Sequence, residues 1–385
     1  MTRHGAPRPG RLAIIGAGVI GLSCAWRAAE AGWSVELIDP EPGGGSSWVA
    51  GGMLAPVTEA WPGEEALLEL GADSLRRWPE FASALAEAAG TPAGLRTEGT
   101  LVVAAAAGDR AELDELAGYL ATLGREVAVL SARELRRLEP AIGPDVRGGL
   151  SVPGDLAVDN RVLLAALRAA ACRAGVRFVA ASAARARGGA VDLVDGATVP
   201  AEVVLIAAGA HSAALHPALT GLLRPVKGEI LRLRHRPGAL PPPSRTVRAV
   251  VHGRPVYAVP RDGGGLVVGA TQYESGFDIE PTVGGVRDLV RDAERVLPGI
   301  AEYALVEVVA GLRPGTADNL PLIGSLDGSG VLVATGHGRN GMLLAPATAA
   351  AVLDLLAGSP VAGPVTAADP ARLMPSGTRL SSTRR

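Results

Sequence analysis

Residues 11–39 constrain the fold of this chain more tightly than any other stretch. The apolar, β-branched run RLAIIG leads into the glycine pattern GAGVIG. LSCAWRAAEA follows with helical spacing, then Gly32, which is typical of a helix end, and then a second strand-like run, SVELID. The order of strand, glycine turn, helix and strand predicts a βαβ unit that opens a doubly wound parallel sheet.

Gly16, Gly18 and Gly21 have the spacing of a dinucleotide-binding turn. The first glycine makes the tight turn, the second lets the backbone approach a pyrophosphate, and the third lets the helix pack closely on the strand. The helix N-terminus then offers unpaired N–H groups to the phosphates. Asp39 ends the second strand, at the distance of about 20 residues expected of an acid that binds a ribose hydroxyl. These features predict dinucleotide binding; the alternative is a glycine turn that merely packs.

A second glycine loop, GHGRNG at 336–341, lies between the strand-like run GVLVAT and the helical run MLLAPATAAAVLDLL. The first glycine pattern alone leaves NAD and FAD both open. A buried flavin ring needs backbone donors beside N1 and the C2 carbonyl, where negative charge gathers on reduction, and a helix N-terminus supplies such donors. A diffusible nicotinamide cofactor does not need a second loop of this kind. The two loops together therefore favour FAD.

Between the two loops, α/β segments alternate with segments that read as antiparallel strands. This alternation predicts an α/β protein with a discontinuous, Rossmann-like FAD-binding domain and an inserted substrate-binding domain. We expect the FAD-binding domain to comprise residues 1–90, 150–222 and 311–370. The substrate-binding domain is expected at 91–149 and 223–310, on a mainly antiparallel sheet with flanking helices.

Two segments are predicted to lack regular structure. EPGGGSSWVAGGMLAPV at 41–57 is rich in glycine and small residues and is expected to form a long, close-packed loop. The tail at 374–385 is polar and basic and is expected to be disordered.

Composition excludes several classes of partner. The formal net charge of -2 gives no sign of a nucleic-acid or anionic-membrane partner, so a small molecule is expected. The longest apolar stretch, from Met342, contains Pro346 and Asp354 and falls short of the ~20 apolar residues of a membrane span. The two cysteines, Cys24 and Cys172, predict no disulfide framework and fit a cytoplasmic location. The His, Cys, Asp and Glu residues have no metal-site spacing, and no metal is predicted.

Four stretches resemble the D-amino-acid oxidase/sarcosine oxidase superfamily of FAD-dependent enzymes. They are IIGAGVIGLSCAWRAAEAG, SSWVAGGMLAPVTEA, AGLRPGTADNLPLIG and GHGRNGMLLAPATA, and the resemblance spans nearly the whole chain. AGGMLAP, PVKGE and the last stretch are more similar to the glycine oxidases of thiamine (thiazole) biosynthesis. Monomeric sarcosine oxidases attach their flavin through a cysteine late in the chain. The last cysteine here is Cys172, so the resemblance implies non-covalent FAD.

The resemblance also implies a reaction. Hydride would pass from the Cα of glycine, and of sarcosine or small D-amino acids, to flavin N5. The imine would hydrolyse to glyoxylate and ammonia, and O2 would reoxidise the flavin to give hydrogen peroxide. A homo-oligomer and a functional link to a thiazole synthase are further expectations. Two alternatives remain open: a D-amino-acid or proline dehydrogenase that reduces a quinone, and an FAD-binding subunit without turnover.

Four residues are expected to serve the substrate. Arg313, in GLRPGT, would clamp the substrate carboxylate through its planar guanidinium, and Tyr257, in PVYAVPR, would add a hydroxyl. Arg339 would assist with substrate or cofactor charge, and Met53 would line the pocket near the ring. The structural alternatives are a surface arginine, a packed sheet tyrosine, a loop contact and a core methionine. His337 is expected to be placed by its backbone in the flavin loop and not to act as a base.

The predicted cofactor contacts come from the two glycine loops, the segment at 46–53 and short stretches after later strands. They are Gly16, Ala17, Gly18, Val19, Ile20, Gly21, Asp39, Ser46, Ser47, Gly51, Gly52, Met53, Ala184, Ala208, Gly209, His337, Gly338, Arg339, Asn340, Gly341, Met342 and Leu343. Pro255 and Gln272, near the inferred pocket, depart from the glycine-specific pattern, which bears on amino-acid selectivity.

Overall fold

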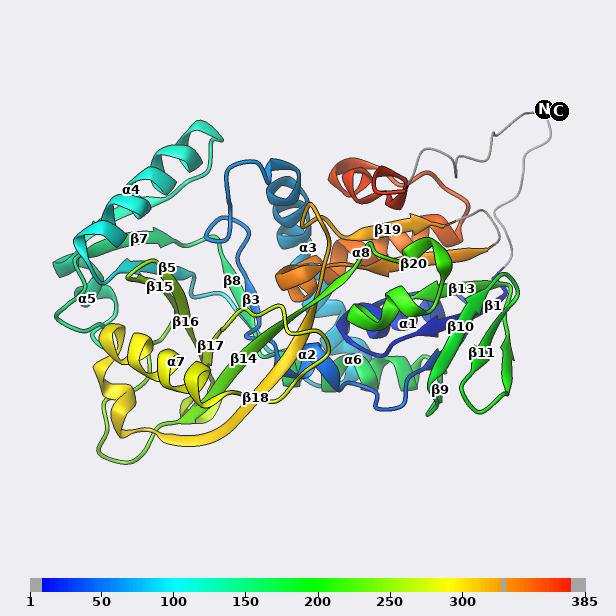
Figure 1. Cartoon of the computed structure of the whole chain (residues 1–385), viewed down its shortest axis with the longest axis horizontal. Helices are drawn as coiled ribbons and strands as arrows, with labels where there is room; N and C mark the ends of the chain where they lie inside the picture. The colour runs from blue at the N-terminus through cyan, green and yellow to red at the C-terminus, as the bar shows by residue number, and fades with distance from the viewer. Residues whose placement is uncertain (1–8, 327–329, 375–385) are drawn as a thin grey trace.

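Two large sheets of different kinds lie side by side in the computed structural model, which describes residues 9–326 and 330–374 (Figure 1). The six-stranded sheet has the order β19-β20-β13-β1-β2-β9. Its strands are parallel except β19, which runs antiparallel to β20. In chain order they are β1 (Arg11–Ile15), β2 (Ser34–Ile38), β9 (Arg177–Val179), β13 (Val203–Ile206), β19 (Leu322–Ser325) and β20 (Val331–Thr335). The predicted βαβ opening and doubly wound parallel sheet are confirmed.

Both faces of this sheet are covered, which explains why its strands are apolar without alternation. Leu12 and Ile14 face a core shared with four helices, whereas Ala13 and Ile15 face a core shared with a small three-stranded sheet. The helices are α1 (Val19–Glu30), α3 (Glu65–Ala89), α6 (Asn160–Arg173) and α8 (Gly341–Leu356). The small sheet consists of β10 (Ala183–Arg187), β11 (Ala190–Leu193) and β12 (Thr198–Pro200).

The eight-stranded sheet has the order β18-β14-β17-β16-β15-β5-β7-β6 and is antiparallel except for the β15–β5 pair. Its strands are β5 (Thr100–Ala104), β6 (Ala128–Ser131), β7 (Gly148–Val152), β14 (Arg224–Arg234), β15 (Thr246–Val251), β16 (Arg254–Arg261), β17 (Gly265–Gly269) and β18 (Ala304–Gly315). Helix α7 (Val283–Val296) packs on it, and α4 (Ala107–Thr122) and α5 (Ala132–Leu138) flank its far end. The expected mainly antiparallel sheet with flanking helices is confirmed.

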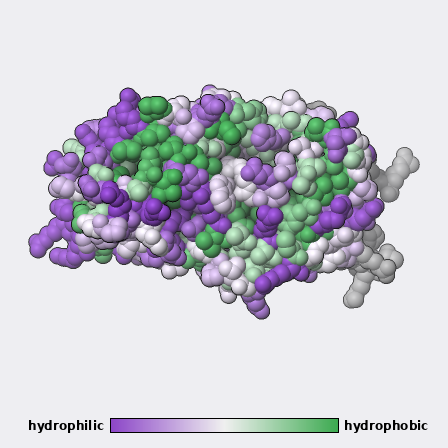
Figure 2. Space-filling model, turned by 90° about the horizontal axis from the view of Figure 1, so that it is seen from below, coloured by the Kyte–Doolittle hydropathy of each residue, from purple (hydrophilic) through white to green (hydrophobic). Residues whose placement is uncertain are grey.

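The longest strands, β14 and β18, pair along their whole lengths and reach from the eight-stranded sheet to the six-stranded one (Figure 1). β18 is the edge strand, and its first half leaves Leu305 and Val306 exposed. Its second half contacts α2 and η1 and is largely buried. Seen from below, the surface mixes apolar areas with hydrophilic side chains (Figure 2).

One expectation about irregular segments needs correction. The stretch 41–57 contains a short helix, α2 (Gly45–Val49), and a short strand, β3 (Met53–Leu54), instead of loop alone. The amide of Asn160 donates to the carbonyl groups of Ser47 and Trp48, so a distant side chain stabilises a helix that local propensity does not favour. β3 pairs with β8 (Leu156–Val158), which also pairs with β4 (Leu95–Arg96). Of the predicted disordered tail, Met374 packs on an apolar cluster, and 375–385 lie outside the described residues.

Short 3-10 helices complete the described chain. They are η1 (Gly209–Ala214), η2 (Pro217–Leu219), η3 (Asp262–Gly264), η4 (Pro298–Glu302), η5 (Gly338–Asn340), η6 (Gly363–Ala368) and η7 (Pro370–Arg372). No helix within residues 9–326 and 330–374 is long and apolar enough to cross a membrane.

Candidate functional site

The predicted cofactor segments follow neighbouring strands of the six-stranded sheet. The 16–21 turn follows β1, Asp39 follows β2, Ala208 and Gly209 follow β13, and the 337–343 segment begins two residues after β20. These four strands are adjacent and parallel, in the order β20-β13-β1-β2. The carboxyl edge of such a sheet is where doubly wound proteins bind ligands. Segments far apart in sequence are therefore brought to one edge of one sheet.

The first glycine turn has little room for side chains. Gly16 has a φ of 102°, and a Cβ at Gly21 would lie 1.8 Å from the Gly16 carbonyl oxygen. Asp39 holds the turn, because its Oδ2 accepts the Ala17 N–H at 2.7 Å. The close turn, the acid and the helix N-terminus of α1 are the features that a pyrophosphate and a ribose require. The residues present fit a dinucleotide such as FAD.

The short helix α2 lies beside this turn. The hydroxyl oxygen of Ser47 accepts the N–H of Val19, the first residue of α1, at 3.0 Å. Ser46 lies under β18, since a Cβ at Gly311 would meet its Cα at 3.2 Å. Ala184 lies apart from these residues, exposed on β10, at the register shift between β10 and β11. The structure therefore brings Ser46 and Ser47 to the glycine turn, whereas Ala184 belongs to the small sheet.

The second glycine loop ends where α8 begins, at Gly341. His337 is buried, and its Nε2 lies 3.0 Å from the hydroxyl of Thr348 on α8. Burial lowers the pKa of His337 to about 3, which keeps the ring neutral at physiological pH. A neutral ring bound to Thr348 fits a structural role for this histidine. Met342 and Leu343 are also buried, in the first turn of α8.

Arg313 and Tyr257 lie close together where the two large sheets meet. The guanidinium of Arg313, on β18, lies against Gly228 of β14 and donates from Nη1 to the carbonyl oxygen of Thr271 at 3.2 Å. The Tyr257 ring, on β16, fits against two glycines: Cβ atoms at Gly51 and Gly269 would approach ring atoms to 2.7 and 2.5 Å. Burial raises the pKa of Tyr257, and the positive charge of Arg313 opposes that shift.

Met53 lies in the same region, because it packs with Tyr257 against one small apolar cluster. The two positions that depart from the glycine-specific pattern, Pro255 and Gln272, are both exposed. Three of the four predicted substrate residues are thus brought together. The fourth, Arg339, is placed differently.

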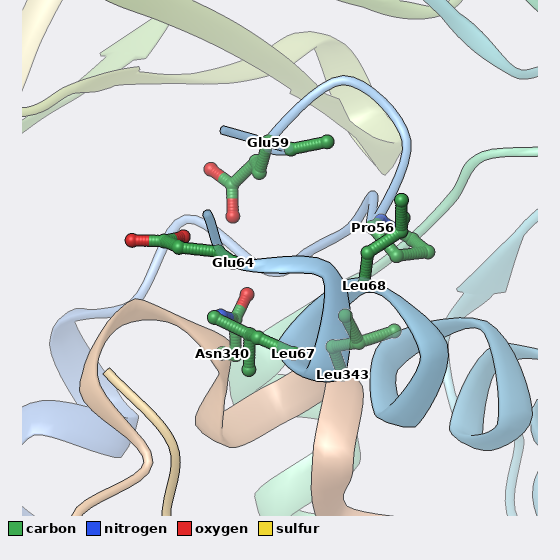
Figure 3. A pocket seen from close by; sticks show the side chains of 8 residues that line it. Pro56, Glu59, Glu64, Leu67, Leu68, Asn340 and Leu343 are labelled. Atoms are coloured by element: carbon green, nitrogen blue, oxygen red, sulfur yellow. The ribbon is translucent and has the colours of Figure 1, made fainter. Parts of the chain in front are cut away.

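Arg339 is bound to two acids. Its Nη2 donates to the Glu64 carboxylate and to the Glu59 backbone carbonyl, both at 3.0 Å. Glu59 in turn pairs with Arg248 at 3.0 Å. Glu59 and Glu64 lie on one side of a small pocket, with Pro56, Leu68 and Leu343 on the other (Figure 3). The charge of Arg339 is therefore largely compensated by the protein itself.

Sequence reasoning missed two residues that hold this region in place. Arg261 is buried and donates to the carbonyl oxygen of Gly51 at 2.6 Å, and burial lowers its pKa to about 10. Asn160, beyond holding α2, accepts from Arg232 and Arg261. A signal for Arg261 was present, because residues 257, 259 and 261 share one face of a strand.

A buried acid supports the loop that carries Glu59. Asp155 is fully buried, and its Oδ2 accepts the Thr58 hydroxyl at 2.8 Å and the Thr58 N–H at 3.4 Å. Burial raises the pKa of Asp155 to about 7, against these hydrogen bonds and the charge of Arg248.

Within the part of the chain that the structure describes, no group of three or more His, Cys, Asp and Glu residues is arranged to hold a metal.

Comparison with known proteins identifies the family to which this site belongs. The family described as DAO, FAD dependent oxidoreductase, matches residues 11–355. The chain belongs to this family. The glycine oxidase of Bacillus licheniformis is 32% identical over 365 residues, which are 90% of this chain and 93% of the relative. The prediction of an FAD-dependent oxidoreductase that resembles glycine oxidases is confirmed.

Two further comparisons bear on this FAD dependent oxidoreductase. The solved structure of glycine oxidase from Geobacillus kaustophilus has a TM-score of 0.85 and 32% sequence identity, covering 93% of this chain and 98% of that one. The bifunctional protein ThiO/ThiG of Synechocystis sp. is 33% identical over 371 residues. Those residues are 94% of this chain and 54% of that relative. The chain thus spans about half the length of the bifunctional relatives that it matches.

Proposed function

We propose that this protein is an FAD-dependent glycine oxidase. The overall reaction would convert glycine, O2 and water to glyoxylate, ammonia and hydrogen peroxide. Sarcosine and small D-amino acids are proposed as further substrates. The similarity to glycine oxidases over nine-tenths of the chain supports this assignment.

The state of Arg313 carries the proposal. Among the described residues, no carboxylate is paired with its guanidinium, which makes one hydrogen bond to a backbone carbonyl. Arg248, Arg261 and Arg339 lie in the same region, and each faces an acid. A partly buried, unpaired guanidinium next to a tyrosine is a fitting receptor for a small carboxylate, which it can bind through two parallel hydrogen bonds.

We propose that the two structural units have different roles in binding FAD and substrate. The six-stranded unit, from residues 1–90, 150–222 and 311–370, would hold FAD through the predicted contacts other than Ala184, which lies on the small sheet. The eight-stranded unit, from 91–149 and 223–310, would complete the substrate chamber. When bound, FAD supplies a two-electron acceptor that O2 can reoxidise. Arg313 and Tyr257 would hold the substrate carboxylate, and Met53 would close the chamber beside them.

Arg339 has a different proposed role. Since Glu59 and Glu64 already engage its guanidinium, we propose that it orders the flavin loop and contributes little to substrate affinity. Arg339→Ala should then lower flavin content more than it raises the KM for glycine. A KM increase as large as that of Arg313→Ala would contradict this assignment.

The experiment is a panel of small amino acids assayed for peroxide, with wild type and Arg313→Ala. Loss of a charge-assisted contact costs about 1.5–3 kcal/mol, so the KM for glycine should rise by about 10- to 160-fold while the protein stays yellow. Arg313→Lys keeps the positive charge but loses the geometry for two parallel hydrogen bonds, so its KM for glycine should lie between those of wild type and Arg313→Ala. An unchanged KM in Arg313→Ala would remove Arg313 from the role.

The same assay separates the alternatives. Glycine-dependent flavin bleaching without peroxide, but with reduction of an added quinone, would indicate a dehydrogenase. Absence of anaerobic bleaching by every amino acid would indicate a subunit that binds FAD without turnover.

Four further properties are proposed. Non-covalent FAD is supported by the cysteines, because Cys24 is buried and Cys172 lies on α6; flavin should appear in the supernatant after acid precipitation. Unpaired cysteines also fit a cytoplasmic location. A homo-oligomer is also proposed and is testable by light scattering. A functional link to a thiazole synthase is supported by the name of the bifunctional ThiO/ThiG relative.

A further inference from the structure

Arg313 donates a hydrogen bond to a segment that follows β17. Thr271 lies two residues after β17, and its carbonyl oxygen accepts from Nη1 of Arg313 at 3.2 Å. The same segment pairs with β14 further on, through two hydrogen bonds between Lys227 and Tyr273. The position of the Thr271 carbonyl therefore sets where one edge of the guanidinium lies.

The side chain of Thr271 is fixed by Glu229. The Thr271 hydroxyl accepts the Glu229 backbone N–H at 2.9 Å and donates to the Glu229 carboxylate at 3.2 Å. Glu229 is 0% exposed, and its other carboxylate oxygen accepts the N–H of Thr282, the N-cap residue of α7, at 2.7 Å. A carboxylate at a helix N-terminus is favoured by the helix dipole. Glu229 thus anchors Thr271 to α7.

Strand alternation makes this arrangement possible. Lys227 and Glu229 point to one face of β14, whereas Gly228 points to the other, toward the Arg313 guanidinium. Lys227 is also buried, and its ammonium group donates to the Glu280 carbonyl at 2.7 Å and pairs with Asp278. The charged side chains of Lys227 and Glu229 hold the segment 271–282, while Gly228 leaves room for the guanidinium.

We propose that Thr271 is a positioning residue for Arg313 and that Glu229 holds it in place. Through this chain of contacts, the Thr271 hydroxyl sets the affinity of the site for a substrate carboxylate without touching the substrate. The inference rests on the proposed function, because it takes Arg313 to be the carboxylate receptor.

The test compares Thr271→Val, which removes the hydroxyl at nearly constant volume, with Thr271→Ser, which retains it. Acetate, a carboxylate without an amine, is titrated into each flavin-loaded variant and followed by flavin absorbance and by calorimetry. A lost net hydrogen bond corresponds to about a fivefold change, so acetate should bind about fivefold more weakly to Thr271→Val. Thr271→Ser should stay within about twofold of wild type in acetate affinity, and Thr271→Val should raise the KM for glycine more than it lowers the rate of flavin reduction at saturating glycine.

Other results would overturn the proposal. Acetate affinity in Thr271→Val equal to wild type, or equally weak binding in the valine and serine variants, would exclude the hydroxyl as the determinant. Thr271→Ala repeats the test if the valine variant does not load flavin. If only the serine variant loads flavin, the hydroxyl serves folding instead, and the proposal fails.

Arg313→Ala separates this failure from failure of the proposed function. If Arg313→Ala leaves acetate affinity unchanged, the carboxylate receptor itself is misassigned. If Arg313→Ala abolishes acetate binding while Thr271→Val does not weaken it, only the role of Thr271 is wrong.

Discussion

Gly228→Ala is the most direct perturbation of the proposed carboxylate receptor. An ideal Cβ at Gly228 would lie 2.3 Å from Nη1, 2.4 Å from Nη2 and 2.5 Å from Cζ of Arg313. The backbone of Gly228 is not in the left-handed region, so alanine introduces no strain in φ. The new methyl group therefore acts on the guanidinium, and the surrounding backbone can stay in place.

The size of the effect follows from these distances. Ordinary van der Waals contact begins at about 3.5 Å, so the guanidinium must withdraw by roughly 1 Å. A shift of about 1 Å in a group that positions a substrate can cost about 100-fold in rate, or roughly 2.7 kcal/mol of transition-state stabilisation. The far end of an arginine can move cheaply, so the free energy of unfolding should change by less than about 1 kcal/mol.

Steady-state peroxide production with glycine, together with thermal unfolding of the flavin-loaded protein, measures both quantities. Gly118→Ala on α4 is the matched control, because a Cβ there meets no atom within 4 Å. The control should keep wild-type kinetics and gain up to about 1 kcal/mol of stability from helix propensity. If Gly228→Ala folds, loads flavin and keeps kcat/KM for glycine within about twofold of wild type, the guanidinium described here is not the receptor.

Three further predictions concern pH and flavin uptake. Burial raises the pKa of Asp155 to about 7, so the folded protein retains a proton that the unfolded chain releases near pH 4. Wild type should therefore lose stability relative to Asp155→Asn as pH rises from about 4 to about 7, by up to about 1.4 kcal/mol per pH unit. Urea unfolding measures this, and a stability difference between the two proteins that does not change with pH would contradict the raised pKa. Burial lowers the pKa of His337 to about 3, so the pH dependence of stability has the opposite sign. Wild type should lose stability relative to His337→Gln as pH falls below about 6.5. Parallel pH profiles of the two proteins would exclude a buried neutral ring. Gly21→Ala places a Cβ 1.8 Å from a backbone oxygen and should purify without most of its yellow colour; full flavin content would refute the close turn.

Local patterns carried most of the fold prediction. The βαβ opening was readable because strand, glycine turn and helix are encoded within residues 11–39, and the apolar runs of the parallel strands follow from burial on both faces. Helix α6 carries a local start signal of the same kind, since Asp159 accepts N–H groups of the first turn. Helix α2 was not readable, because the group that stabilises it, Asn160, lies more than a hundred positions away.

The candidate site shows the same limit. Tyr257 and Arg313 could be singled out by type and surrounding motif, but their neighbours could not. Arg339 was expected to be available for charge on a substrate or cofactor, and only the folded chain reveals Glu59 and Glu64 beside it. The contact between Thr271 and Arg313 depends on the register of three strands, which a single sequence does not specify.

The pairing of β14 with β18 has a consequence for how the chain tolerates insertions. The register shifts between Arg232 and Leu233, where Val306 of β18 is left without a partner, and it is regular from there to Arg313. One residue added between Glu307 and Arg313 would turn the arginine to the opposite face of the sheet. One residue added at the exposed end, beside Val306, would only enlarge an irregularity that already exists. Length variation in this strand should therefore be confined to its outer end.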